Sequence, residues 1–211
     1  MARAPVRVAH TTTSGTFNLD GGSWPVENNV WVVGDEAECV VIDAPHATGP
    51  ILDLIAGRAV TAILCTHAHD DHVGAARELS EATSAQVWLH PADEVLWRQS
   101  HPDFDFTPLA DGHEVIVADT TLTVLHTPGH SPGAVCLFAP QLNTVFSGDT
   151  LFQGGPGATG RSYSNFDSII SSIRSRLLTL PAEITVRTGH GPSTTIGDER
   201  PHLDEWIARG H

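Results

Sequence analysis

Short apolar runs, separated by polar or glycine-rich turns, form the main pattern along this chain of 211 residues. In the first half these runs predict strands at residues 6–12, 28–34, 39–43, 60–65 and 86–90. In the second half they predict strands at residues 114–117, 122–125, 134–138, 144–147 and 184–187. The stretches 17–25 and 100–111 are predicted as loops. The second loop either covers a pocket or packs Phe104 and Phe106 into the core.

Apolar residues at helical spacing lie between these strands. One such face follows the strand at 60–65 and consists of Val73, Ala76, Leu79 and Ala82. A second face consists of Ile169, Ile170, Ile173 and Leu177, and Asp167 is the expected cap of that helix. Further short helices are expected at 50–56, 91–97 and 203–208. Both halves begin with strands and are interrupted by helices, which predicts the α/β class.

Composition narrows the class of protein and of partner. A hydrophobic content of 40% predicts a packed core, and one domain over residues 1–211 is expected. The net charge of −14 argues against nucleic acid or an anionic membrane as a partner. Neither a membrane-spanning run nor a secretory signal is visible in the sequence. Cys39, Cys65 and Cys136 each lie in an apolar run, so we expect buried reduced thiols and a cytoplasmic protein, with a homo-oligomer left open.

The densest chemistry lies in Thr66-His67-Ala68-His69-Asp70-Asp71-His72, between a predicted buried strand and a predicted helix. Ligand sites in open α/β sheets favour this position at the carboxyl end of a strand. Neutral imidazole is the commonest protein ligand for zinc, copper, iron and nickel, and carboxylates complete such sites. The alternative is a polar turn with Asp70 or Asp71 as a helix cap. The density of histidine favours the metal site.

Other polar residues also follow predicted strands. Asp43 and Asp149 each end an apolar run, and His190 lies in a tight turn after the strand at 184–187. His130 lies in the Pro- and Gly-rich loop 126–133, which is stiff and permits unusual backbone angles. Each of these residues alone is compatible with an ordinary turn or loop. His126 alternates with apolar strand residues and is interpreted as structural.

In combination, these motifs resemble those of the metallo-β-lactamase superfamily. The resemblance rests on the His-x-His-x-Asp-His spacing of residues 67–72, on the Thr-Pro-Gly-His-Ser-Pro-Gly loop around His130, and on the order of all five motifs. The ending GHGPSTTIGDER at 189–200 is similar to that of glyoxalase II-like members. The resemblance implies a four-layer αββα sandwich, with a site at one edge where loops from both halves meet.

The resemblance also implies a ligand set for two divalent metal ions, expected to be zinc, with iron or manganese as alternatives. His67, His69 and His130 would hold the first metal, Asp71, His72 and His190 the second, and Asp149 would bridge them. Asp43 would order the ligand loops. Arg161, which follows Gly160 as in relatives, and the nearby Tyr163 would bind an anionic part of the substrate. Trp24 and Phe152 are considered as pocket residues, although core or loop packing is favoured for them.

The implied activity is hydrolysis of a small-molecule thioester of a low-molecular-weight thiol through a hydroxide that bridges the two metals. The bridging Asp149 favours the glyoxalase II-like branch, and few residues follow His190 to form the helical domain that binds glutathione in full-length relatives. A persulfide dioxygenase with one iron, held by His67, His130 and Asp149, is the main alternative. Ser162-Tyr163-Ser164 differs from the Thr-Asp-Phe of dioxygenase relatives and favours the hydrolase. Lactone or other ester hydrolysis and a non-catalytic metal-binding scaffold are further alternatives.

Overall fold

The computed structural model describes residues 4–210, so residues 1–3 and 211 of the expected 1–211 domain lie outside the described residues. One six-stranded mixed sheet contains, in spatial order, β1 (Arg7–Leu19), β2 (Gly22–Gly34), β3 (Glu38–Ile42), β4 (Ala59–Leu64), β5 (Val87–Leu89) and β6 (Thr107–Pro108). A second contains β14 (Thr194–Thr195), β13 (Thr185–Thr188), β10 (Thr144–Gly148), β9 (Val135–Ala139), β8 (Thr120–His126) and β7 (Glu114–Val117). A small hairpin pairs β11 (Leu151–Phe152) with β12 (Gly155–Pro156).

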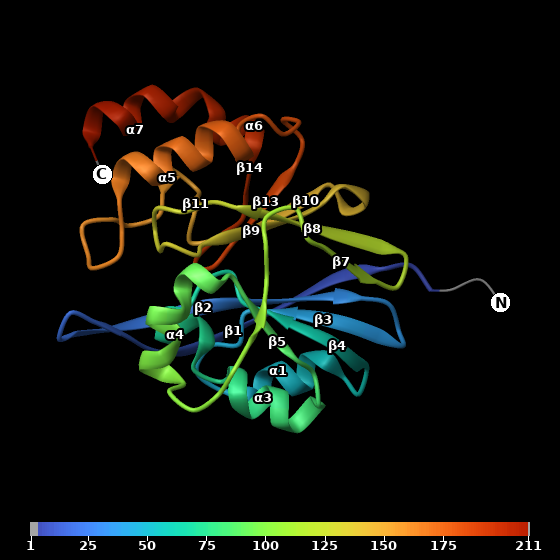
Figure 1. Cartoon of the computed structure of the whole chain (residues 1–211). Helices are drawn as coiled ribbons and strands as arrows, with labels where there is room; N and C mark the ends of the chain where they lie inside the picture. The colour runs from blue at the N-terminus through green and yellow to red at the C-terminus, as the bar shows by residue number, and fades with distance from the viewer. Residues whose placement is uncertain (1–3, 211) are drawn as a thin grey trace.

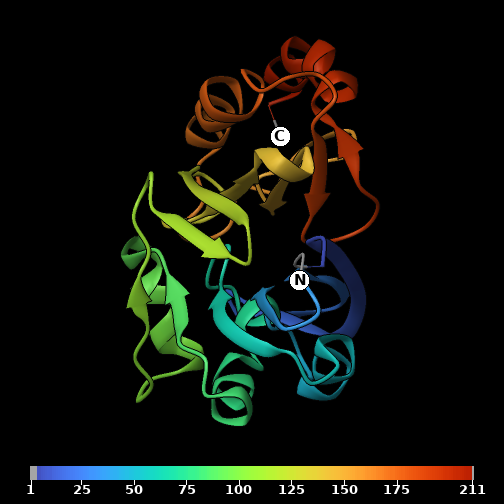
Figure 2. The same cartoon turned by 90° about the vertical axis from the view of Figure 1, so that its right-hand side faces the viewer.

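Helices cover the outer face of each sheet (Figure 1). The outer face of the first sheet is covered by α1 (Thr48–Ile55), α3 (Ala76–Thr83) and α4 (Glu94–Ser100). The short α2 (Asp70–Val73) lies in the loop after β4. The second sheet is covered by α5 (Phe166–Ser172), the π-helical segment Ile173–Leu177, α6 (Ile196–Glu199) and α7 (Leu203–Arg209). Short 3₁₀ helices are formed by Pro91–Asp93, Pro140–Leu142 and Arg200–His202. The predicted four-layer αββα sandwich is confirmed, and Figure 2 shows its two halves stacked.

Three apolar layers hold the sandwich together, because successive side chains on a strand point to opposite faces. In β3, Val40 and Ile42 pack between the sheets, whereas Cys39 and Val41 pack under the outer helices. In β9 the same alternation places Val135 and Leu137 in the layer between the two sheets. Cys136 lies in the layer under the helices of the second sheet, where the predicted apolar face of α5 also packs. All three cysteines are buried free thiols, as predicted.

The stretch 17–25, predicted as a loop, is instead the end of a long hairpin. β1 and β2 pair from Arg7 opposite Gly34 to Leu19 opposite Gly22. Only Asp20 and Gly21 turn the chain, and both have positive φ, of 53° and 75°. A two-residue turn of this kind matches the twist of the flanking strands, and Asp-Gly is among its strongest sequence signals. The prediction was wrong because the glycines and aromatic residues were interpreted as breaking the strand.

Two smaller predictions also change. The cap of α5 is Asn165 and not Asp167, because Asn165 has an extended backbone and its side chain accepts a hydrogen bond from the Ser168 N–H at 2.8 Å. In the loop 100–111, Phe104 and Phe106 pack against the core layer under the first sheet, which favours the core alternative over a flap. No helix in the part of the chain between residues 4 and 210 is long and apolar enough to cross a membrane.

Candidate metal centre

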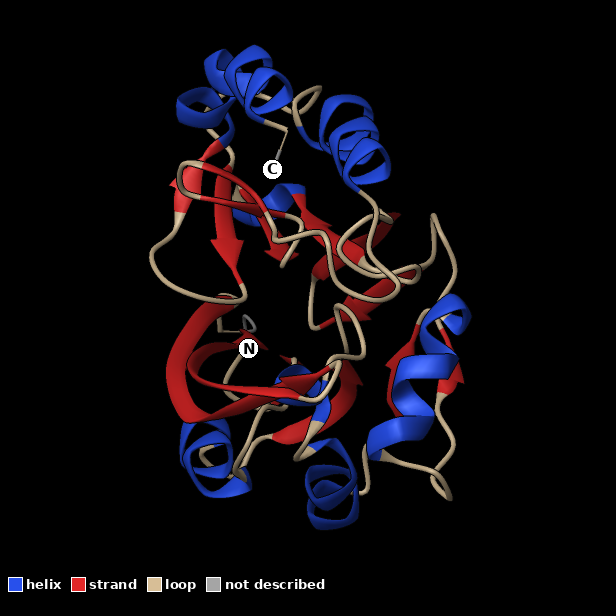
Figure 3. Ribbon diagram, turned by 90° about the vertical axis from the view of Figure 1, so that its left-hand side faces the viewer, coloured by secondary structure: helices blue, strands red, loops and turns tan. Residues whose placement is uncertain are grey.

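The predicted ligands lie on loops that leave the carboxyl ends of strands in both sheets. His67 and His69 follow β4, and Asp71 and His72 lie in the first turn of α2. His130 follows β8, Asp149 follows β10 directly, and His190 follows β13. Figure 3 looks onto the edge of the sandwich where loops of the two halves face each other. The structure therefore brings together residues from both halves of the chain.

Three histidines form the first ligand group. The Nδ1 atom of His69 lies 3.0 Å from Nε2 of His67 and 3.0 Å from Nε2 of His130. All three side chains are buried. The geometry of this group is one that could hold a metal ion.

Asp71, His72 and His190 form the second ligand group. The two Nε2 atoms of His72 and His190 are 3.2 Å apart, and Oδ2 of Asp71 lies 3.3 Å from Nε2 of His190. Asp149 lies between the two groups. Its Oδ1 is 3.3 Å from Nε2 of His72, and its Oδ2 is 3.5 Å from Nε2 of His130 and 3.4 Å from Nε2 of His190. One carboxylate thus faces histidines of both groups.

Hydrogen bonds around the site orient the imidazoles. A carbonyl oxygen can only accept, so Nδ1 of His130 donates to Ala158 O at 2.9 Å and Nδ1 of His190 donates to Glu27 O at 2.7 Å. A neutral imidazole that donates from Nδ1 presents a lone pair at Nε2. In the neutral form, both imidazoles would therefore direct Nε2 lone pairs toward the other ligand atoms.

The donor set fits two cations. Lone pairs of neighbouring imidazoles that face one another at about 3 Å repel unless a proton or a metal ion lies between them. In addition, Oδ1 of Asp149 is buried without a hydrogen-bond partner, as is Nε2 of His69. Buried polar atoms are normally satisfied, so the unpartnered carboxylate oxygen points to a ligand at this position.

Two imidazoles of the first group, those of His67 and His69, are held in the neutral form. Burial lowers the pKa of His69 to about 3. Burial, together with the neighbouring imidazole of His72, lowers the pKa of His67 well below its usual value. Neutral imidazole is the form that binds a metal ion, so these side chains are ready to act as ligands at neutral pH.

The second group concentrates negative charge. Burial acts to raise the pKa of Asp71, but His72 outweighs it and the pKa falls to about 2. The pKa of Asp149 is also held well below its usual value, because the charges on His72 and His190 outweigh burial. Conversely, Asp149 outweighs burial at His190 and raises its pKa to about 10. With both carboxylates ionised, this half of the site attracts positive charge, either as protons on imidazole or as a cation.

Asp43 fixes the start of the ligand loop by hydrogen bonds. Its carboxylate accepts hydrogen bonds from the Thr66 N–H at 2.7 Å, from the Thr66 hydroxyl at 2.8 Å and from Nδ1 of His72 at 2.9 Å. Its φ of 60° places it in the left-handed region at the end of β3. These contacts confirm the prediction that Asp43 orders the ligand loop, and they direct Nε2 of His72 into the site.

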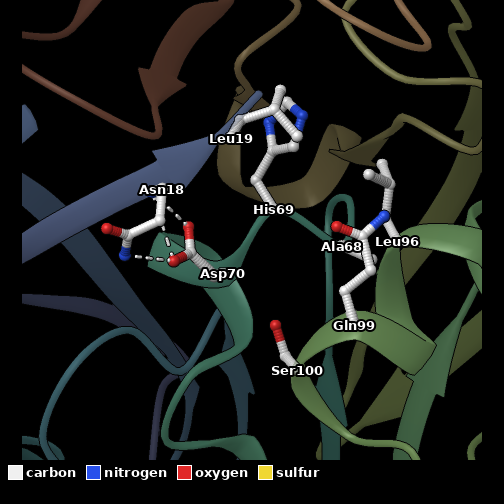
Figure 4. Close-up of a pocket in the computed structure, with 8 residues that line it drawn as sticks. All are labelled: Asn18, Leu19, Ala68, His69, Asp70, Leu96, Gln99 and Ser100. Carbon is white, nitrogen blue, oxygen red and sulfur yellow. Dashed lines mark hydrogen bonds between the residues drawn. The ribbon is translucent and has the colours of Figure 1, made fainter. Parts of the chain in front are cut away.

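Two asparagines that the sequence analysis did not single out fix the acidic ligand and its loop. Asn28 is fully buried and donates to Oδ2 of Asp71 at 3.0 Å, while its own oxygen lies 2.7 Å from Nε2 of His46. Asn18 donates from its backbone and its side chain to the carboxylate of Asp70, which joins β1 to the start of α2 (Figure 4). Asp70 therefore attaches the β1–β2 hairpin to α2, and it is not among the residues of the ligand groups. Two polar residues at the start of an apolar run, Asn28-Asn29, were the available signal.

A pocket of about 190 Å³ opens onto the ligands. Its outer wall is formed by Phe17, Trp24 and Val26 of the hairpin and by Arg161, whose guanidinium carbon lies 3.8 Å from the centroid of the Trp24 ring. Trp24 thus lines the pocket, contrary to the expected core or loop packing. The Ser162 N–H donates a hydrogen bond to Oδ2 of Asp20 at 3.0 Å, which joins the Arg161 loop to the hairpin tip.

Not every residue expected at the substrate pocket is found there. Tyr163 is 45% exposed and has a φ of 69°, and it is not among the described residues that line the pocket. Phe152 does not line it either, although its ring centroid is 6.2 Å from that of His190. His126, as predicted, lies outside the ligand groups, where it stacks on His90 with centroids 4.0 Å apart. A second cavity of about 230 Å³ borders His69 between β1 and α4 (Figure 4).

Comparison with known proteins places this geometry in a family. The model of the metallo-beta-lactamase superfamily matches residues 23–190. The probable metallo-hydrolase YqgX of Bacillus subtilis (strain 168) is 34% identical over 200 residues, which cover 85% of this chain and 94% of that protein. The hydroxyacylglutathione hydrolase GloC of Haemophilus influenzae is 33% identical over 193 residues, covering 84% and 87%. The crystal structure of TTHA1623 in a di-iron-bound form aligns with a TM-score of 0.76 at 36% identity, covering 84% and 94%.

The chain therefore belongs to the metallo-β-lactamase superfamily. This family binds metal ions, and the two His/Asp groups described above are the place in this chain where such ions fit. The family and the names of its relatives support a metal-dependent hydrolase.

Proposed function

We propose that this protein is a two-metal hydrolase that cleaves thioesters of a low-molecular-weight thiol. His67, His69 and His130 would hold one divalent ion, Asp71, His72 and His190 the other, and Asp149 would contact both. The observation that carries the proposal is the position of Asp149, whose two oxygens face histidines of both groups at 3.3–3.5 Å. A carboxylate in this position can contact both ions of a two-metal hydrolytic site.

Two bound divalent ions would supply the hydrolytic chemistry, because they lower the pKa of water from about 15.7 towards about 7 and polarise a carbonyl oxygen. The chain contributes fixed ligands, since Asp43 holds His72 and backbone carbonyls hold His130 and His190. Such outer contacts fix the tautomer and the ring orientation. Phe17 and Trp24 form one side of the pocket.

The pocket supports a small substrate with an anionic part. Arg161 is the one arginine or lysine among the described residues that line it, and its planar guanidinium stacks over Trp24. A stacked guanidinium keeps its donor edges available for a carboxylate. The 33% identity to a protein named hydroxyacylglutathione hydrolase supports a thioester as the scissile bond.

We propose zinc as the metal and keep iron and manganese as alternatives, and the di-iron form of TTHA1623 supports testing iron first among these. The three buried free thiols support a reducing compartment such as the cytoplasm.

A persulfide dioxygenase with a single iron is the second candidate. His130 and Asp149 approach within 3.5 Å, and the rings of His67 and His130 have centroids 4.9 Å apart. Two histidines and one carboxylate are the ligand set of mononuclear iron oxygenases. Ser162-Tyr163-Ser164, which differs from the Thr-Asp-Phe of dioxygenase relatives, favours the hydrolase over this second candidate.

The deciding experiment compares the two reactions on the same preparation. Thiol release would be followed with hydroxyacyl thioesters of glutathione and of other small thiols, and oxygen uptake would be followed with a glutathione persulfide. The proposal expects metal-dependent thiol release with at least one thioester and no oxygen uptake. Oxygen uptake without thioester cleavage would overturn it in favour of the dioxygenase.

A further inference from the structure

Asp93 is a fully buried carboxylate close to the ligands, and the sequence motifs assign it no role. It lies at the end of the 3₁₀ helix Pro91–Asp93, between β5 and α4. Its Oδ2 accepts hydrogen bonds from the Ala68 N–H at 2.9 Å and from the Ser131 hydroxyl at 2.7 Å. Its Oδ1 accepts a short hydrogen bond from the Gly133 N–H.

These donors belong to the two loops that carry the first ligand group. Ala68 lies between His67 and His69, and Ser131 follows His130. The first loop leaves β4 of one sheet, whereas the second joins β8 and β9 of the other. One side chain from a third segment therefore joins the two loops at the point where their imidazoles meet.

We propose that Asp93 is a positioning residue for the first metal: it sets the spacing of His67, His69 and His130 and thereby the affinity of that ligand group. This inference rests on the two-metal centre proposed above. Asp43 provides the comparison, because it accepts a hydrogen bond from Nδ1 of His72 and so orients a ligand of the second group. Asp43 and Asp93 are thus two buried carboxylates that hold ligand loops without being ligands themselves, and of these two only Asp43 belongs to a family motif.

The local packing supports this assignment. A buried carboxylate is strongly unfavourable unless its oxygens are hydrogen-bonded, and all three donors to Asp93 would be left unsatisfied without it. Residue 133 is a glycine, and a Cβ there would lie 2.8 Å from Cγ of Asp93. The His130 loop therefore approaches the carboxylate as closely as a backbone without a side chain permits.

The test is Asp93→Asn in the full-length protein, titrated with Co²⁺ and with Zn²⁺ against competing chelators. The amide keeps one acceptor oxygen for Ala68 and Ser131 but turns an N–H toward the Gly133 N–H. We expect the affinity of one metal equivalent to fall about 10- to 100-fold, as for other outer contacts of metal ligands. The other equivalent should weaken less, because none of the three donors to Asp93 is next to Asp71, His72 or His190 in the chain. Asp103→Asn, in an exposed loop nearby, is the matched control.

Single-site backgrounds identify which equivalent is weakened. With His190→Ala, only the first group is complete, and Asp93→Asn should weaken the remaining metal. With His69→Ala, only the second group is complete, and Asp93→Asn should have no effect, whereas Asp43→Asn should weaken the metal. Ser131→Ala removes one of the three hydrogen bonds and should cause a smaller loss in the same direction, which provides the test if Asp93→Asn does not fold.

The outcomes separate the inference from the proposed function. If the wild-type protein binds two equivalents, two results would show that Asp93 is only structural. One is an equal loss of metal affinity from Asp93→Asn in both backgrounds, and the other is a lower melting temperature of the variant with unchanged metal affinities. Wild-type protein that never binds two equivalents would contradict the two-metal centre itself. A selective loss in the His190→Ala background supports the inference.

Discussion

Gly189 and Asp149 approach each other so closely that a Cβ at position 189 would lie 2.2 Å from Oδ1 of Asp149. It would also lie 2.7 Å from Cε1 of His72. The end of β13 is in turn fixed, because the Gly189 N–H donates to Gly148 O at 2.8 Å and Gly189 O accepts from the Asn29 N–H at 2.8 Å. A side chain at this position therefore cannot be accommodated without moving a ligand.

We predict that Gly189→Ala weakens metal binding and turnover while the protein stays folded. Overpacking of this kind costs about 1–3 kcal/mol, here at the carboxylate that faces both ligand groups. Circular dichroism would report the fold, and chelator competition would report the metal affinity. Gly49→Ala is the control, since a Cβ at that position meets nothing within 4 Å. Equal metal affinity of the Gly189→Ala and wild-type proteins would contradict the packing argument.

The ligands themselves make a stronger prediction. Replacing His67 by Ala or Asp149 by Asn should abolish turnover, because the first removes a ligand of one group and the second removes the contact to both. The far-ultraviolet spectrum should remain that of a folded protein, since the core layers do not include these side chains. Full activity in either variant would refute the proposed centre. His126→Ala, at a half-buried histidine stack outside the ligand groups, should retain its metal.

The residues grouped in this centre could be found from the sequence because each lies just after a strand, within a short motif. Residues 67–72 carry four ligands in six positions, and the order of the later motifs identified His130, Asp149 and His190. The apolar runs located the strands of both sheets for the same reason, since burial on both faces leaves a continuous hydrophobic pattern.

What could not be predicted depends on contacts between distant segments. Asn28 meets Asp71 across 43 residues and Asp93 meets Gly133 across 40, and nothing in either local sequence indicates the partner. Trp24 entered the pocket because the hairpin β1–β2 extends over the site, which depends on the two-residue turn at Asp20-Gly21. Tyr163 was chosen for its nearness to Arg161 in sequence, but adjacent residues in a turn point in different directions.

Arg161 should affect substrate binding more than the chemical step. Arg161→Ala is expected to raise KM for an anionic thioester about tenfold or more, because a hydrogen bond to a charged group contributes about 1.5–3 kcal/mol. The metal content should remain that of the wild type. Arg174→Ala, an exposed arginine on the π-helical segment Ile173–Leu177, serves as control. An unchanged KM for anionic substrates would show that the guanidinium only packs on Trp24.

Metal removal should destabilise the fold. The ligand groups join loops of both sheets, so ions that bind only the folded protein stabilise it by about 2.7 kcal/mol at a free concentration of 100 times Kd. For a chain of this size, dialysis against chelator should lower the melting temperature by roughly 5–10 °C. Re-addition of metal should restore it, and the Asp149→Asn variant should respond less. A melting temperature that is indifferent to metal would contradict binding at this site.

Metal content per chain, measured by elemental analysis of protein purified without added metal or chelator, tests the central claim most directly. The two ligand groups and the position of Asp149 between them predict about two equivalents of divalent metal per chain. About one equivalent of iron, with no second site filled on titration with Zn²⁺, would contradict the two-metal centre and favour oxygen chemistry at His67, His130 and Asp149.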